Sequence, residues 1–389
     1  MKIPLLSAIL AIFPAFASAA PSPIETHILD SINSIWAMNF DESEAHLDKA
    51  TKLDPDYPYT YFGRANLSWL RFVYVSQQTD PKLKKKFEKQ VEEAVAASQK
   101  WLKTHPKDAQ AYLALSGSYG LRARLSTIQK HWIRALMDGR RAVKYTRKAH
   151  KLNPKLYDAL LGAGVYDYYS DALPRGIKLL SRLILGGDRD RGIASLKIVA
   201  EKGNFTKIAA QLLLIEIYTE DQWGARDPQK AVDIISALRK EFPQSPIFHK
   251  IEHVCLYEAK RFKELKTSVD DYQKRIDADW AYYPKKDRAR MFVTQGTAQF
   301  AQAKLPEAQT AFQEAGKLAG SSKKPDRWGV WGLVRLGQVR DALKSRKEAV
   351  EAYASAMKFP DIWGFRGVAK KGRRRPILLG LTVGQLPPP

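Results

Sequence analysis

A helical pattern that ends in a proline recurs four times and constrains the fold more than any other feature. A small residue is followed by packing positions four and then three residues later, and by a proline five beyond that. The copies are Ser43, Leu47, Ala50, Pro55; Ala94, Ser98, Trp101, Pro106; Ala142, Thr146, Ala149, Pro154; and Ala231, Ile235, Leu238, Pro243. Such steps place the first three positions on one helical face, and the proline ends the helix. We therefore predict helices that each bury one stripe.

The residues after three of these prolines predict a second helix that packs on a neighbour. A large residue six positions after the proline is followed, four positions later, by a small one. These pairs are Tyr61 and Ala65, Tyr112 and Ser116, and Leu160 and Gly164. A small side chain lets two helix axes approach, while a large one fills the adjoining gap. Pro243 departs from this rule, because His249 and His253 occupy the matching positions.

Two segments near the C-terminus repeat the pattern most closely. The first segment contains Phe292, Gly296, Ala308, Phe312 and Ala315. The second contains Leu333, Gly337, Ala349, Tyr353 and Ala356 at the same sequence spacing. The sequence here resembles the tetratricopeptide repeat (TPR) family, whose unit is a pair of antiparallel helices of about 34 residues. The resemblance implies an all-α chain, with a TPR-like α-α superhelix of roughly six to eight hairpins over residues 20–360.

The chain departs from the family pattern in two regions. Pro55, Pro106 and Pro154 are spaced more widely than the family period, so residues 73–86 and 121–137 are expected to lengthen helices or insert loops. Residues 167–226 match poorly, although 191–201 and 208–218 still read as helices. We therefore expect an exported member with divergent repeats.

The two ends differ in composition from the repeats. Residues 1–19 combine Lys2, an apolar stretch and a small-residue site at Ala17 to Ala19, which is the layout of a cleaved signal peptide. We expect export to the periplasm of a Gram-negative cell, or secretion, with no membrane-spanning segment in the mature chain. Residues 361–389 are basic, end in prolines, and are expected to form a flexible tail.

The net charge of +23 is concentrated between residues 121 and 155, where eleven Lys or Arg accompany the single acid Asp138. Four of these cations share one face of a predicted second helix, opposite Ala142 and Ala149: Arg140, Lys144, Arg147 and Lys151. That face is either a solvated surface or a contact for an anionic polymer. Trp132 and Tyr145 are expected to lie in the core, and nucleic acid is not the expected partner.

A helical superhelix binds extended peptides or partner helices through its concave surface, which the first helix of each hairpin lines. Arg64, Tyr119 and Tyr168 lie on or beside such helices. Tyrosine and arginine are enriched at binding hot spots, which makes these three the candidate partner-binding residues. The main hypothesis is a non-enzymatic exported scaffold for protein or peptide partners, in cell-envelope assembly or maintenance.

Two other hypotheses stay open. The basic face predicts a carrier or tether for an anionic envelope component, either lipid or glycan. The third hypothesis, ranked last, is an enzyme with its site in 167–226. The sequence contains no recognised catalytic or cofactor-binding motif, and His249 with His253 lacks an evident third metal ligand. We expect no cofactor and no metal, and we expect Cys255, the only cysteine, to be buried.

Overall fold

The computed structural model describes residues 21–76, 78, 80–171, 187–222, 224–321, 325–361 and 364–376. In these ranges the chain is helical and contains no strand. The α-helices are α1 (Pro23–Trp36), α2 (Phe40–Leu53), α3 (Pro58–Leu70), α4 (Pro81–Thr104), α5 (Ala109–Ile128), α6 (Trp132–Leu152), α7 (Leu160–Asp171), α9 (Arg189–Lys202), α10 (Lys207–Glu220), α11 (Pro228–Glu241), α12 (Pro246–Glu258), α13 (Phe262–Asp277), α14 (Arg288–Ala301), α15 (Leu305–Lys317), α16 (Arg327–Ala342), α17 (Arg346–Met357) and α18 (Phe365–Arg374).

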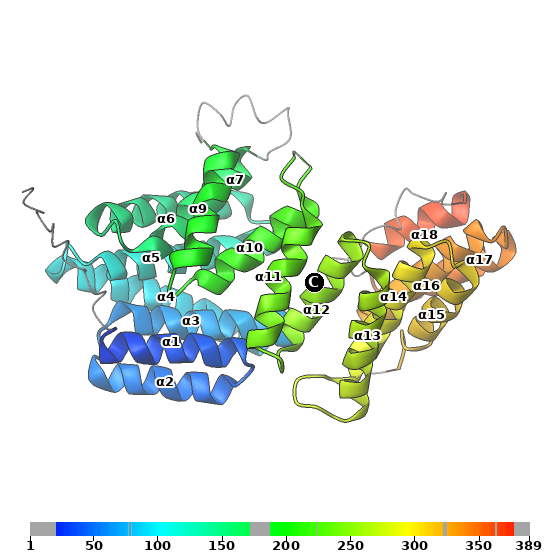
Figure 1. Ribbon diagram of the computed structural model, residues 1–389, viewed down its shortest axis with the longest axis horizontal. Helices are drawn as coiled ribbons and strands as arrows, with labels where there is room; N and C mark the ends of the chain where they lie inside the picture. The colour runs from blue at the N-terminus through cyan, green and yellow to red at the C-terminus, as the bar shows by residue number, and fades with distance from the viewer. Residues whose placement is uncertain are drawn as a thin grey trace, which may run out of the picture.

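Consecutive helices pack in pairs, and each pair packs on the next. The pairs begin with α1 and α2 and continue to α16 and α17, so the described ranges hold eight hairpins followed by α18. Figure 1 shows the chain rising from α2 through α6, turning at α7 and α9, and continuing through α12 toward α18. The predicted all-α superhelix of helical hairpins is confirmed.

Local sequence signals set where the helices begin and end. Aspartates accept backbone hydrogen bonds at the starts of five helices: Asp80, Asp108, Asp188, Asp227 and Asp326. Their carboxylates satisfy amides that have no partner inside the helix. The four recurring prolines each follow a helix end by two positions, after Leu53, Thr104, Leu152 and Glu241. Their predicted role as helix stops is confirmed.

The large and small positions predicted near the C-terminus meet across the hairpins. A methyl group added at Gly296 would lie 2.7 Å from the Phe312 ring, and one at Gly337 would lie 2.5 Å from the Tyr353 ring. The second-helix positions that the pattern placed on one stripe are buried: Ala142, Ala149, Ala308, Phe312, Ala315, Ala349, Tyr353 and Ala356. Glycine at 296 and 337 therefore provides the space that the opposing ring fills.

Longer helices account for the wide proline spacing. A π-helical segment, Arg71–Val75, extends α3, and α4 has 24 residues. The α5 and α6 helices have 20 and 21 residues, compared with 14 and 13 in α14 and α15. The hairpin of α5 and α6 therefore extends beyond the length of a standard repeat.

Contacts between distant helices close the first part of the superhelix. Trp36 stacks on Phe248 of α12 with ring centroids 5.5 Å apart, and Phe40 meets the edge of Tyr282 at 5.6 Å. Lys286 Nζ donates to the carbonyl of Val75 at 3.4 Å. The end of α1 thus lies against α12.

The segment expected to be a flexible tail begins with a packed helix. In α18, Phe365 stacks on Trp331 of α16 with centroids 4.8 Å apart, and Arg346 donates to the carbonyls of Gly372 and Arg373. The predicted domain end at residue 360 is therefore too early, because α18 covers the last hairpin. The signal-peptide prediction for 1–19 and residues 377–389 lie outside the described ranges. Within those ranges no helix combines the length and apolar character needed to cross a bilayer.

Candidate docking surface

The candidate site is built on the overhanging end of the α5 and α6 hairpin. The α5 helix ends at Ile128, and Lys130 adopts a positive φ of 62° that reverses the chain. His131 N–H donates to the Ser126 carbonyl at 2.8 Å, which fixes the turn. Trp132 is then the first residue of α6.

Five large apolar side chains are exposed around this turn. Trp132 is 62% exposed and Ile133 is 79% exposed, and Ile128, Leu136 and Met137 are also exposed. The buried stripe of α6 begins only at Asp138, so the first turns of the helix cover no core. Contiguous exposed apolar groups on a folded chain mark interaction sites, because leaving them in water has a free-energy cost. We call these five residues the apolar tip.

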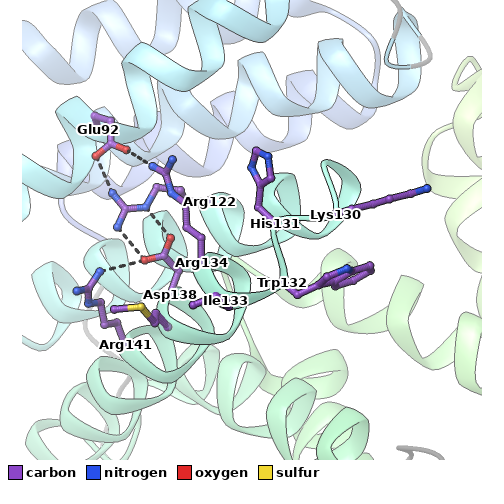
Figure 2. Close-up of a pocket in the computed structure, with 10 residues that line it drawn as sticks. Glu92, Arg122, Lys130, His131, Trp132, Ile133, Arg134, Asp138 and Arg141 are labelled. Carbon is purple, nitrogen blue, oxygen red and sulfur yellow. Dashed lines mark hydrogen bonds and ion pairs between the residues drawn. The ribbon is translucent and has the colours of Figure 1, made fainter.

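An ion-pair network around the buried carboxylate of Asp138 supports the tip. Arg122 of α5 donates to both Asp138 oxygens, each at 2.8 Å, and Arg141 reaches the same carboxylate at 3.2 Å. The Asp138 side chain is 1% exposed. Its hydrogen bonds raise the pKa of the Arg122 guanidinium above the usual value. Arg122 also binds Glu92 of α4 at 2.6 Å, which ties the tip to the preceding hairpin (Figure 2).

An open hollow lies beside the network. It has a volume of about 730 Å³, and the residues that line it include Trp132, Ile133 and Met137 together with Arg134 and Glu92. Figure 2 shows Trp132 and Lys130 pointing away from the ion-pair network. Apolar and charged groups therefore border the same depression.

The basic face predicted on α6 continues from the apolar tip. Arg140, Lys144, Arg147 and Lys151 are all exposed. Steps of four and three keep them on the helical stripe that starts at Ile133, so the combined surface runs about 27 Å at 1.5 Å per residue. Lys144 lies 5.7 Å from the centre of the Tyr145 ring. Within the described ranges Arg140, Arg147 and Lys151 form no ion pair, so their charges face solvent.

The three predicted partner-binding residues hold helices together. Arg64 of α3 donates a hydrogen bond of 2.6 Å to Asp48 of α2. Tyr119 is buried under Arg122, whose guanidinium lies 4.9 Å from the ring centre, and Tyr168 is buried.

The hydroxyl of Tyr168 donates to Asp221 at 2.8 Å, and its burial, with that bond, raises the Tyr168 pKa above its usual value. The sequence suggested that these rings and Arg64 face a groove. Neighbouring helices cover Tyr119 and Tyr168, whereas Arg64 is half-buried in an exposed ion pair. Spacing identifies a helical face without showing which neighbour covers it.

The structure also corrects the expectation for Trp132, which was assigned to the core. Tyr145 is half-buried and stacks beside Tyr119 with centroids 5.8 Å apart, whereas Trp132 projects into solvent. The segment from Trp132 to Met137 contains four large apolar residues and no acid. That local composition was the available sign of an apolar tip.

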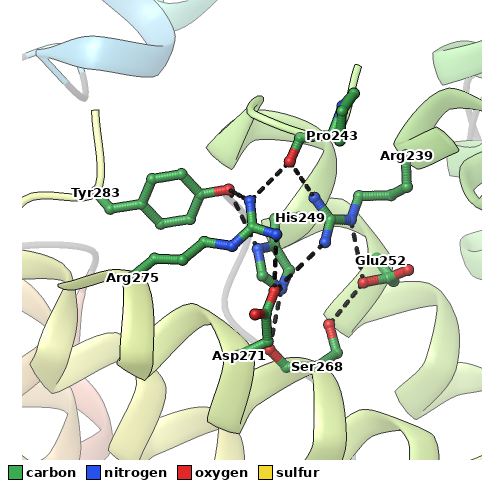
Figure 3. A network of polar contacts seen from close by, with 8 residues as sticks. All are labelled: Arg239, Pro243, His249, Glu252, Ser268, Asp271, Arg275 and Tyr283. Carbon is green, nitrogen blue, oxygen red and sulfur yellow. Dashed lines mark hydrogen bonds and ion pairs between the residues drawn. The ribbon is translucent and has the colours of Figure 1, made fainter. Parts of the chain in front are cut away.

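The histidine pair in α12 forms part of a buried polar network. His249 Nε2 contacts the Ser268 carbonyl at 2.9 Å, and Arg275 donates to the Tyr283 hydroxyl at 3.0 Å (Figure 3). Burial lowers the pKa of both His249 and His253, and nearby arginines lower it further. Arg239 and Arg275 border the cluster, and the nearby carboxylates of Glu252 and Asp271 pair with these arginines. The histidine pair is therefore part of the packing between α12 and α13.

The divergent middle consists of helices at the predicted places. The α9 and α10 helices span the segments read as helical within 167–226. Arg191 binds both Asp167 oxygens, at 2.7 and 2.8 Å. This acid therefore joins α7 to α9. Residues 172–186 of the region lie outside the described ranges.

Comparisons with known proteins bear on the fold alone. No protein-family model matches this chain, and no curated protein sequence matches it. Solved structures similar to it include a tetratricopeptide repeat protein from Parabacteroides merdae, at 17% identity over 77% of this chain and 94% of that chain, with a TM-score of 0.31. A human IFIT1 dimer with m7Gppp-AAAA is 14% identical over 92% and 81%, with a TM-score of 0.44. Yeast Tom70 is 12% identical over 91% and 89%, with a TM-score of 0.34.

The fold is a TPR-like α-solenoid. This assignment rests on the paired helices, the large residues packed on glycines, and the proline stops described above. In TPR-like solenoids each hairpin contacts mainly its neighbours. The closure of α1 onto α12 adds a long-range contact to that scheme.

Proposed function

We propose that this protein is a non-enzymatic scaffold that binds an acidic, amphipathic segment of a partner protein along α6. The observation that carries the proposal is the continuity of the apolar tip with the basic stripe of Arg140, Lys144, Arg147 and Lys151. An apolar side chain of the partner would enter the hollow beside Trp132, and acidic residues would lie along the cations. Apolar anchors supply affinity, while complementary charge guides orientation and speeds association.

This site differs from the concave surface that the fold suggested. Trp36 and Phe248 already fill the space between α1 and α12. The α6 stripe instead presents free cations and uncovered apolar groups. The partner is therefore expected to bind a face of the third hairpin.

Site-specific photo-crosslinking tests the proposal. A photoreactive amino acid at Ile133, in the full chain in its native host, should yield a discrete adduct with one acidic protein. The purified partner should then bind at least about 10-fold more weakly when Arg140, Arg147 and Lys151 are changed to glutamine. Changing the exposed Lys240, Lys263 and Lys274 to glutamine alters net charge equally and should leave affinity within about twofold. Equal losses of affinity in the two triple variants would contradict binding of the partner along α6.

A second candidate function is a tether to an anionic membrane or glycan through the same stripe. It is favoured by Trp132, which is typical of membrane interfaces, beside cations that attract anionic headgroups. Sedimentation with vesicles containing phosphatidylglycerol, compared with neutral vesicles, tests the lipid form. Binding lost in Trp132→Ala and in high salt would support the tether. If the chain binds neither kind of vesicle, the lipid tether is rejected and binding of a protein partner remains the proposed function.

Export is part of the proposed function, and we place the scaffold in the cell envelope. The support is the layout of residues 1–19, with its apolar stretch and Ala17 to Ala19 site. Cell fractionation should find the chain outside the cytoplasm, with a mature N-terminus near residue 20. Removal of residues 1–19 should retain it in the cytoplasm. Equal export of the truncated chain would contradict the proposal.

A further inference from the structure

Three metal-binding side chains converge on the hairpin of α1 and α2. His27 and Asp30 lie on α1, three positions apart, and His46 lies on α2. The His27 and His46 Nδ1 atoms are 3.3 Å apart, and His46 Nδ1 is 3.5 Å from Asp30 Oδ2. One ligand atom from each residue lies within 4.8 Å of the other two. Within the described ranges no other such group of three meets this distance limit.

These separations match the geometry of a tetrahedral metal. Zinc binds imidazole nitrogen and carboxylate oxygen at about 2.1 Å, so two ligand atoms of a tetrahedron lie about 3.4 Å apart. The distances from His46 to His27 and to Asp30 bracket that value. The Asp30 side chain is 44% exposed, so its carboxylate has room to reorient toward a bound ion.

The helix packing holds the two histidines in place. Ser31 and Ser43 share a buried hydrogen bond of 2.9 Å between α1 and α2, next to Asp30 and one helical turn before His46. The His46 side chain is 16% exposed, so it is partly shielded while the site keeps access to solvent.

We propose that His27, Asp30 and His46 bind one divalent transition-metal ion, such as zinc, with water completing the coordination. Two imidazoles and one carboxylate suit zinc, nickel or copper, whereas magnesium and calcium prefer oxygen ligands alone. The ion joins the two helices of the first described hairpin. Such a crosslink strengthens the hairpin whose Trp36 also packs on Phe248 of α12.

Isothermal titration of the full mature chain, purified without a histidine tag and treated with a chelator, tests the site. Zinc chloride should bind with one equivalent per chain. His27→Ala and His46→Ala should each weaken binding by more than about 10-fold, because each removes a direct ligand. His105→Gln changes an exposed histidine outside the cluster and should leave affinity within about twofold.

Two further measurements separate metal binding from a folding defect. Cobalt should give the intense visible absorption of a tetrahedral complex in the parent chain, and Asp30→Asn should shift or weaken that spectrum while leaving the helical circular dichroism unchanged. Zinc should raise the melting temperature of the parent with increasing concentration but leave that of His46→Ala unchanged. Absence of zinc binding at micromolar concentration, or binding unaffected by all three changes, would overturn the proposal.

Discussion

Trp36 at the end of α1 stacks on Phe248 of α12, with ring centroids 5.5 Å apart and ring planes 25° from parallel. Both side chains are buried. This contact joins helices that are far apart in the sequence and closes the curve of the first hairpins. In a solenoid whose repeats contact mainly their neighbours, it couples the first hairpin to the later ones.

Replacing Trp36 should destabilise the whole first part of the chain. Trp36→Ala removes a large buried ring and is expected to lower the free energy of unfolding by about 3 to 5 kcal/mol. Urea unfolding followed by circular dichroism measures the change. Trp132→Ala removes the same side chain from an exposed position and should change stability by no more than about 0.5 kcal/mol. Similar effects of both changes would show that the stacked pair has no special role.

Position 337 should accept only glycine, because the Tyr353 ring packs directly against it. An added methyl group would lie 2.5 Å from that ring, so Gly337→Ala is expected to cost about 1 to 3 kcal/mol despite the better helix propensity of alanine. Gly120 of α5 has no atom within 4 Å of the added methyl position. Gly120→Ala should therefore stabilise the chain by about 0.5 to 1 kcal/mol. Urea unfolding should therefore show changes of opposite sign in the free energy of unfolding of the two variants.

Arg122 should stabilise the hairpin by neutralising buried Asp138. Arg122→Met leaves that carboxylate without its main partner and is expected to cost about 3 to 5 kcal/mol. Adding Asp138→Asn removes the buried charge and should restore part of the loss in a double-mutant cycle. Lys100→Met breaks an exposed pair with Asp56 and should leave the stability almost unchanged, because solvent screens that pair. Additive effects of the Arg122 and Asp138 changes would contradict the coupling.

The buried histidines should make the fold sensitive to acid. Burial, followed by the charge of Arg290, lowers the pKa of His253 to about 3, while an unfolded histidine titrates near pH 6.5. The unfolded chain therefore binds protons that the folded chain does not. The stability that comes from keeping the histidine uncharged is fully present above about pH 6.5. It is lost as the pH falls toward 3, by up to about 1.4 kcal/mol per pH unit for each buried histidine.

Urea unfolding of the parent chain and of His253→Phe between pH 4 and 7.5 tests this expectation. The variant lacks the titrating ring, so its stability should fall less steeply below pH 6.5. His105→Gln, at an exposed site, serves as the control and should follow the parent. Parallel curves for the parent and His253→Phe would show that His253 is protonated in the folded chain.

The sequence was sufficient to predict the helical hairpins and much of their inner packing. Residues such as Ala149 and Gly337 repeat at helical spacing, and the turns carry prolines, so local patterns identified the buried stripes. The docking surface was only half predicted. The spacing of Arg140 and Lys144 placed them on an exposed face. Trp132 was assigned to the core because its apolar neighbours Ile133, Leu136 and Met137 resemble a segment that packs inside.

The sequence by itself determined where helices start and stop and which face of most helices is buried, because capping, proline stops and side-chain periodicity act over a few residues. Only the tertiary structure decided that α1 meets α12, that neighbours cover Tyr119 and Tyr168, and that His27 and His46 converge. The histidines converge because α1 packs on α2 within one hairpin, whereas the contact of α1 with α12 depends on the angles between successive hairpins. Small rotations accumulate along a solenoid, so contacts between distant repeats depend on the whole curve.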